Sequence, residues 1–461
     1  MSLNCTVILA AGEGTRMKTL SSKVLTKVVF KSMLERTIDA ALKSDVEDVC
    51  VVTGHKSEEV RKVLDDKYET VLQSELLGTG HAVMQARDFI SRHADGNVLI
   101  LNGDAPLMDV ETVSGALKMH TESSNSATVI SASIDNPFGY GRIVRDENGK
   151  FLRIVEQKHA SEEEQKICEI NSGAYWFKCG DLIAALDTLL SSPEKYAHGD
   201  KKVEYYLPEV LEILMEENKN VGAFTTDNPD VVLGANDRVQ LLELNEIVRH
   251  KILNAQMLNG VSIPCTDGII IGDDVVIGKD TEILPNTIIR GKTVIGENSV
   301  IGPNTVIDDS TIGNNTHLDN VKCNCATVCD NVTVGPFVNI RPNAVVSDSV
   351  HIGNFVEIKN SNIGNGSKVP HLSYIGDTDM GSKCNIGGGT ITVNYDGKKK
   401  HRTTIGNDVF VGCNTKLVAP VKLGNHSYTA AGSTLTEDVP EDSLAIARSR
   451  QVIKVNWNKN K

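Results

Sequence analysis

The segment IGDDVVIGKDTEILPNTIIRGKTVIGENSVIGPNTVI, residues 271–307, decides the fold of the second half of this chain. An isoleucine recurs in it at every sixth residue. A six-residue period with one inward aliphatic side chain per repeat is typical of a parallel β-helix, in which each coil buries its apolar side chain against neighbouring coils. Separate β-hairpins would not produce this unbroken series, which comprises Ile271, Ile277, Ile283, Ile289, Ile295, Ile301 and Ile307.

The period continues beyond this segment with one slip and one interruption. It slips by one residue at Ile312, becomes irregular, and returns between Ile405 and Leu435. The stretch 394–404 breaks it with polar and basic residues, which predicts a loop that projects from the β-helix. The lysines of this loop fit either an exposed tip or the binding of phosphate.

The first half of the chain instead alternates short apolar strands with helical patterns. Thr6–Ala11, Val49–Val52 and Asn97–Leu101 are the clearest strands. This alternation predicts a Rossmann-like α/β domain with a mostly parallel sheet covered on both faces. Gly12 and Asp104 follow two of these strands, at the edge where such sheets bind ligands.

Three segments follow from this change of pattern. We expect an α/β domain at residues 1–236, a linking helix at 237–260, and a β-helix domain with a C-terminal tail at 261–461. The length of 461 residues also favours more than one hydrophobic core.

Composition limits the partners of the chain. Its net charge of -13 gives it no general attraction to nucleic acid or to an anionic membrane. Its ten cysteines are scattered, and Cys323, Cys325 and Cys329 lack the spacing of a zinc site. With no signal-peptide pattern at the start, free thiols in the cytoplasm are expected.

A series of motifs narrows the function. Residues 9–17, LAAGEGTRM, form a glycine-rich loop after a strand, but neither a Walker sequence nor a GxGxxG sequence. It is followed by QSELLGTGHA at 73–82, NGDAPL at 102–107, GYGRI at 139–143, IVEQK at 154–158, INSG at 170–173 and GANDR at 234–238. Together these resemble the bacterial bifunctional N-acetylglucosamine-1-phosphate uridylyltransferases / glucosamine-1-phosphate acetyltransferases, from about residue 6 to about residue 450.

The resemblance implies that the first domain transfers uridylyl from UTP to N-acetylglucosamine-1-phosphate with Mg²⁺. It implies that Lys23 stabilises charge on the triphosphate and that Gln73, Gly78 and Thr79 bind and recognise the uracil base. Asp104 and Asn236 match the Mg²⁺ ligands. The remaining nucleotide and sugar positions are Leu9, Ala10, Ala11, Gly12, Gly103, Gly141, Glu156 and Asn171.

For the β-helix, the resemblance implies acetyl transfer from acetyl-CoA to glucosamine-1-phosphate. His371 matches the catalytic base. The expected sugar-phosphate residues are Arg341, Lys359, Tyr374 and Asn385, and the expected acetyl-CoA residues are Gly388, Asn394, Tyr395, Cys413, Ala431 and Arg448. Arg341 and Lys359 are 18 residues apart, about one coil, so they should stack.

The chain departs from the family pattern at Ser22, Thr26 and Phe30, where the family has Pro, His and Gly. These changes lie near Lys23. The resemblance also implies a homotrimer. A pyrophosphorylase with a single activity and a non-catalytic β-helix is the alternative enzyme, and a non-enzymatic scaffold is the weaker one.

Overall fold

The computed structural model describes residues 4–196 and 203–460. The chain forms two compact units, Met1–Val248 and Arg249–Lys461, and the boundary between them falls within helix α9 (Arg238–Leu258). In the described residues, no helix is both long and apolar enough to cross a membrane. All ten cysteines are free thiols.

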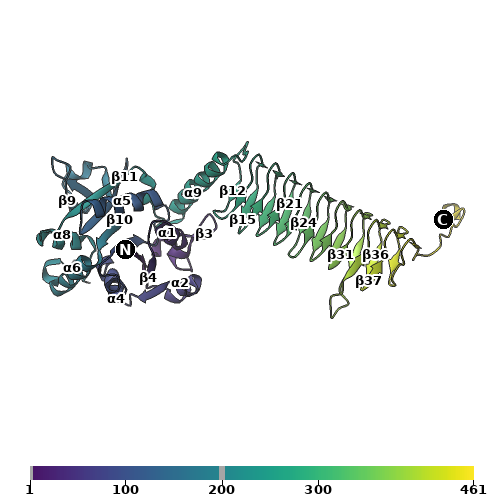
Figure 1. Ribbon diagram of the computed structural model, residues 1–461, viewed down its shortest axis with the longest axis horizontal. Coiled ribbons are helices and arrows are strands. Elements are labelled where there is room, and N and C mark those ends of the chain that lie inside the picture. Colours follow the sequence, from purple (N-terminus) through teal and green to yellow (C-terminus); the bar gives the residue numbers. More distant parts are fainter. Residues whose placement is uncertain (1–3, 197–202, 461) are drawn as a thin grey trace. The chain divides into compact units, whose positions relative to one another are not determined.

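The first unit is built on a mixed sheet (Figure 1). Four neighbouring strands run parallel in the order β6, β1, β4, β5, and β10 pairs antiparallel with both β6 and β7. The strands are β1 (Cys5–Ala10), β4 (Asp48–Thr53), β5 (Glu69–Leu72), β6 (Asn97–Asn102), β7 (Ala127–Ser133), β10 (Glu169–Lys178) and β11 (Val221–Thr226), with β8 (Arg142–Arg145) and β9 (Phe151–Val155) as an added ribbon.

Helices cover both faces of this sheet. Val7 and Ile8 are adjacent in β1 and fully buried, yet they belong to different apolar clusters, one on each face. The helices are α1 (Met33–Leu42), α2 (Ser57–Leu64), α3 (Thr79–Gln85), α4 (Arg87–Ser91), α5 (Val110–Glu122), α6 (Cys179–Ser191), α7 (Pro193–Tyr196) and α8 (Pro208–Glu216). The predicted mostly parallel sheet with two covered faces is confirmed.

The second unit is a left-handed parallel β-helix that runs from β12 (Ile270–Ile271) to β40 (Leu444–Ala445) (Figure 1). The strands pair with the third strand after them, except that β38 (Tyr428–Thr429) pairs with β40, and this pairing produces three sheets of 10, 9 and 10 strands. The isoleucines of the six-residue series are at most 7% exposed, so the prediction that they point inward is confirmed.

Hydroxyl side chains join successive coils. Thr281 is buried, and its Oγ1 donates to the carbonyl of Gly296 at 2.7 Å and accepts from the amide of Ser299 at 3.1 Å. Ser299 repeats the arrangement one coil later, since its Oγ accepts from the amide of Thr316. The recurring Thr and Ser residues therefore satisfy backbone groups that would otherwise be buried without partners.

One corner of the β-helix changes character along its length. Its backbone needs a positive φ, which Asn tolerates, and Asn286, Asn304 and Asn320 occupy it in the early coils. In the next coils the same corner carries Phe337, Phe355 and Leu372, with φ of 61°, 59° and 41°. These three apolar side chains, which we name the apolar ridge, are 55%, 55% and 65% exposed.

The predicted projecting loop is present. Strand β33 (Ile391–Val393) and strand β34 (Thr403–Ile405) are separated by residues 394–402, which leave the β-helix (Figure 1). Thr403 pairs with Thr378, a spacing wider than one ordinary coil because the loop is inserted between them.

Candidate active sites

The first candidate site lies at the carboxyl edge of β1 and β6. Lys23 belongs to a short 3-10 helix (Lys23–Leu25), and its Nζ lies 2.5 Å from Asp104 Oδ2 and 3.0 Å from Asn236 Oδ1. Arg16 donates to the same oxygen of Asn236 at 3.0 Å. Lys23 thus contacts two residues that lie 81 and 213 positions away from it in the sequence.

The two oxygens of Asp104 and Asn236 converge on one cationic position, which the Lys23 ammonium occupies. An anionic carboxylate and an amide carbonyl are hard oxygen donors of the kind that bind Mg²⁺, with substrate phosphates and water as further ligands. Within 4–196 and 203–460, no cluster of three or more His, Cys, Asp or Glu could hold a metal. As two hard oxygen donors, the Asp104 carboxylate and the Asn236 side-chain carbonyl fit Mg²⁺ that is bound together with nucleotide phosphates.

The glycine-rich loop packs against Lys23. Gly14 has φ +60°, and a Cβ on it would lie 2.6 Å from Lys23 Cβ. The loop is also tied to the neighbouring strand ends, because Gly103 donates its amide to Leu9 at 2.9 Å and His55 donates to Ala11 at 3.1 Å. Gly14 and Arg16 were quoted in the motif but not predicted as site residues, since their contacts are set by the fold.

The predicted uracil residues lie together after β5. Gln73 is 4% exposed, and its Nε2 lies 3.1 Å from both the Gly78 carbonyl and His81 Nδ1. Gly78 has φ +95° and touches the Tyr205 backbone so closely that no Cβ would fit. The Thr79 hydroxyl accepts from the amide of Leu207 at 3.0 Å, so it holds the start of α8.

The three predicted sugar residues also meet. The amide of Asn171 donates to the Gly141 carbonyl at 2.9 Å, and a Cβ on Gly141 would lie 3.0 Å from Glu156 Oε1. Asn171 Nδ2 donates to the Tyr175 hydroxyl at 2.7 Å, and burial raises the pKa of Tyr175, so the phenol stays protonated. Gly141 is thus held between Asn171 and Glu156.

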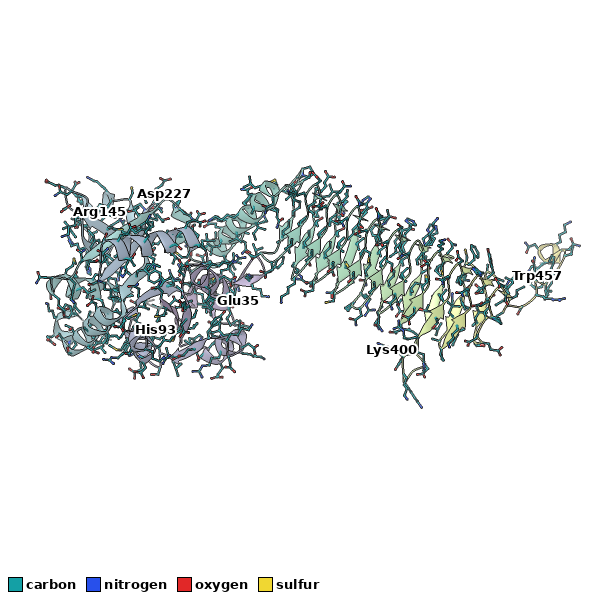
Figure 2. The ribbon with its side chains drawn as sticks, in the orientation of Figure 1. Glu35, His93, Arg145, Asp227, Lys400 and Trp457 are labelled. Atoms are coloured by element: carbon teal, nitrogen blue, oxygen red, sulfur yellow. The ribbon has the colours of Figure 1, made fainter. Side chains whose placement is uncertain are left out.

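The second candidate site, in the β-helix, contains a basic cluster. The pairing of β24 (Val338–Ile340) with β27 (Glu357–Lys359) sets Arg341 beside Lys359, as the spacing predicted. Arg341 also forms an ion pair with Glu357 at 2.7 Å. Contact with the Lys400 ammonium lowers the pKa of Lys359, and burial and the charge of Arg341 add to the shift. Figure 2 shows Lys400 on the projecting loop.

Two further predicted residues join this cluster through Asp377. Asn394 Nδ2 donates to Asp377 Oδ2 and lies 3.4 Å from the hydroxyl of Tyr374. Asn360 donates to the other carboxylate oxygen at 2.5 Å. Tyr395 does not join, because it is 57% exposed and donates to Gly397 in its own loop. Asp377 and Glu357 were missed as site residues, because only the stacking of coils brings them to this cluster. Lys400 belongs to the loop lysines for which the sequence left open either an exposed tip or phosphate binding.

His371 begins a column of residues on a different sheet. Its Nδ1 lies 3.2 Å from Asn354 Oδ1, which can only accept, so Nδ1 donates through its N–H and the other ring nitrogen, Nε2, is not engaged by this contact. Gly388 lies directly against it, since a Cβ there would be 3.3 Å from His371 Cβ.

The column continues in the same register through the strands that follow β29 (Lys368–His371). Lys368, Asn385, Phe410 and Tyr428 are Cα partners in turn, and the residues three places after each are His371, Gly388, Cys413 and Ala431. Arg448 follows, with its Cδ 3.7 Å from the position of a Cβ on Gly432. Gly388, Cys413 and Ala431 therefore form one line of small side chains beside His371, and the longer Arg448 side chain lies at the end of this line.

The two units and their sites define a transferase chain with a nucleotide-handling half and a hexapeptide half. Residues 5–228 match the model of the family described as Nucleotidyl transferase. Residues 268–309 and 402–437 match Bacterial transferase hexapeptide (six repeats).

Whole-chain relatives identify the family. The chain is 48% identical to the Bifunctional protein GlmU of Thermoanaerobacter pseudethanolicus, over 98% of this chain and 97% of that protein. It is 46% identical to the Bifunctional protein GlmU of Acetivibrio thermocellus, over 98% and 96%. The chain belongs to the GlmU bifunctional proteins. It is a bifunctional enzyme with a nucleotidyltransferase half and an acetyltransferase half. The family therefore favours the bifunctional enzyme over a pyrophosphorylase with a single activity and a non-catalytic β-helix.

Proposed function

We propose that the chain acetylates glucosamine-1-phosphate with acetyl-CoA and then couples the N-acetylglucosamine-1-phosphate to UTP, which releases pyrophosphate and forms UDP-N-acetylglucosamine. The observation that carries this proposal is the convergence of Lys23, Asp104 and Asn236 in one unit, together with the His371 column in the other.

In the uridylyl reaction, the phosphate oxygen of the sugar attacks the α-phosphorus of UTP. Bound Mg²⁺, held by Asp104 and Asn236, would neutralise charge on the phosphates. Lys23, whose ammonium lies between these two oxygens in the structure, would turn to the phosphates when Mg²⁺ takes that position. Its side chain is only 9% exposed, so the ammonium would interact strongly with phosphate in a site that excludes most water. Gly141, Glu156 and Asn171 would hold the sugar so that its phosphate is in line for attack.

In the acetyl reaction, the sugar amine attacks the thioester carbonyl, a C–N bond forms and the CoA thiolate leaves. His371 Nε2 takes the proton of the amine, because its hydrogen bond to Asn354 leaves that nitrogen free to accept. Arg341, Lys359 and Lys400 bring three cations together where a phosphate would neutralise them. Gly388, Cys413 and Ala431 carry only small side chains along one line, which would leave room for the extended arm of acetyl-CoA.

We infer that the chain assembles as a homotrimer, with a second copy covering the apolar ridge. Phe337 and Phe355 stack with their ring centroids 5.3 Å apart, and with Leu372 they line an open groove of about 550 Å³. Exposed aromatic residues in a backbone conformation that favours Asn indicate a surface kept for contact. Replacement of Phe355 with Asp should convert the trimer into monomers by light scattering, and a trimer that persists would contradict the assignment.

One product analysis tests the proposed reactions. The chain is incubated with glucosamine-1-phosphate, acetyl-CoA, UTP and Mg²⁺, and the sugar products are separated by chromatography and identified by mass spectrometry. UDP-N-acetylglucosamine is expected. Asp104→Ala should stop the reaction at N-acetylglucosamine-1-phosphate, whereas His371→Ala should block acetylation but still use supplied N-acetylglucosamine-1-phosphate. If either variant keeps its own reaction, the role assigned to that residue is wrong.

A further inference from the structure

The side-chain amide of Gln73 has only one orientation in the folded chain. One of its two terminal atoms lies 3.1 Å from the carbonyl oxygen of Gly78, which can only accept, so that atom is the NH₂ nitrogen Nε2. The same nitrogen lies 3.1 Å from His81 Nδ1. Among residues 4–196 and 203–460, no protein group donates to the other amide atom, Oε1.

The ring of His81 must accept a hydrogen bond from Gln73. Gln85 Nε2 lies 3.2 Å from the other ring nitrogen, and it also donates to the His81 backbone carbonyl. A neutral imidazole has one lone pair for two neighbouring donors, and an imidazolium has none. Gln73 is 4% exposed and cannot turn away, whereas Gln85 is only partly buried and has the carbonyl as an alternative acceptor. The lone pair therefore belongs to Nδ1. Burial lowers the pKa of His81 by more than the backbone and the charge of Glu75 raise it, so the ring stays neutral.

We propose that His81 is a positioning residue that makes the nucleotide site selective for uracil over cytosine, by holding the Gln73 amide with Oε1 toward the base. This proposal rests on the proposed uridylyl transfer and on the assignment of Gln73 to the base. His81 does not itself touch the substrate. It acts through the hydrogen bond from Nε2, and Gly78 supplies the second hydrogen bond to the same nitrogen.

The chemistry of the two bases explains the selectivity. Uracil carries a hydrogen on N3, which can donate to Gln73 Oε1. Cytosine has a lone pair at N3, which would face the oxygen and leave both groups unpaired in a buried site. Cytosine would fit only if the amide turned over, and turning it over would break the hydrogen bonds to Gly78 and His81.

The test compares UTP with CTP in the full-length chain, using N-acetylglucosamine-1-phosphate and Mg²⁺ and measuring kcat/KM for each nucleotide. His81→Ala should lower the UTP/CTP ratio about fivefold, the factor that corresponds to one net hydrogen bond. His81→Asn should restore the ratio, because the Asn Oδ1 can accept in place of Nδ1. Gln85→Ala is the matched control and should keep the wild-type ratio. Acetyl transfer should be equal in all four proteins.

A wild-type ratio in His81→Ala would overturn the proposal. So would a ratio in His81→Asn as low as that in His81→Ala, because removal of the ring alone would then explain the effect. An equal loss in Gln85→Ala would show a general loosening of the site. If the wild-type chain forms no nucleotide sugar at all, the proposed uridylyl transfer fails, and that outcome differs from each of the others.

Discussion

Replacement of Gly14 with Ala should damage uridylyl transfer far more than it damages the fold. Gly14 has φ +60°, where an Ala backbone costs roughly 1–2 kcal/mol. The new Cβ would also stand 2.6 Å from Lys23 Cβ and 2.9 Å from Lys23 Cδ. Carbon atoms prefer separations of about 3.5–4.0 Å, so Lys23 or the loop must move by about 1 Å.

Lys23 cannot move without losing contacts, because its side chain is only 9% exposed and its ammonium is held by Asp104 and Asn236. A displacement of about 1 Å at a catalytic group lowers a rate about a hundredfold. We expect that loss in kcat for uridylyl transfer, measured by release of pyrophosphate. The backbone strain of about 1–2 kcal/mol at position 14 should lower the melting temperature of the first unit by about 2–8 °C.

Gly149→Ala is the matched control. Gly149 has φ +80°, and a Cβ on it would meet nothing within 4 Å. This variant should show a similar thermal loss with the full uridylyl rate, and acetyl transfer should be unchanged in both variants. If Gly14→Ala keeps the wild-type uridylyl rate, or if Gly149→Ala loses as much, the contact between Gly14 and Lys23 does not position the catalytic ammonium.

Three other predictions follow from particular residues. Phe30→Gly should raise the melting temperature by a few degrees. Val29 and Phe30 form a two-residue hairpin turn with φ of 46° and 70°, and Gly at the second position relieves about 1 kcal/mol of backbone strain. An unchanged melting temperature would contradict this prediction. Burial lowers the pKa of His120 from 6.5 to about 4, so protonation of this side chain opposes folding. The free energy of unfolding should be highest above pH 6.5 and should fall by roughly 3 kcal/mol as the pH drops to 4. In urea unfolding, the free energy of unfolding of His120→Gln should depend less on pH between these values. Asn354→Asp should move the acidic limb of the pH profile for acetyl transfer upward by about one unit, because a carboxylate at His371 Nδ1 favours the imidazolium; an unmoved limb would mean that this hydrogen bond does not tune the base.

The fold could be predicted largely from local pattern. The isoleucine series from Ile271 to Ile307 specifies a β-helix because each coil repeats the same burial, and the structure keeps every one of them inside. The predicted strands Thr6–Ala11 and Asn97–Leu101 end within one residue of the observed strand ends at Ala10 and Asn102. They therefore placed Gly12 and Asp104 correctly at the edge of the sheet where parallel strands present their carboxyl ends. The antiparallel strand β10 within the sheet was not predicted, since strand direction depends on partners distant in sequence.

The sequence alone therefore determined the two architectures, the family resemblance and the residue types of both sites. Only the tertiary structure decided which of these residues meet. Lys23 and Asn236 are 213 positions apart, and Asp377 joins Asn360 to Asn394 across two coils. Periodicity reports which face of an element is buried, but the direction of a polar side chain depends on groups that only chain folding brings near. For that reason the motifs predicted Lys359 and His371 and left the role of Lys400 open, while the contacts of Asp377 and Asn354 emerged only from the packed coils.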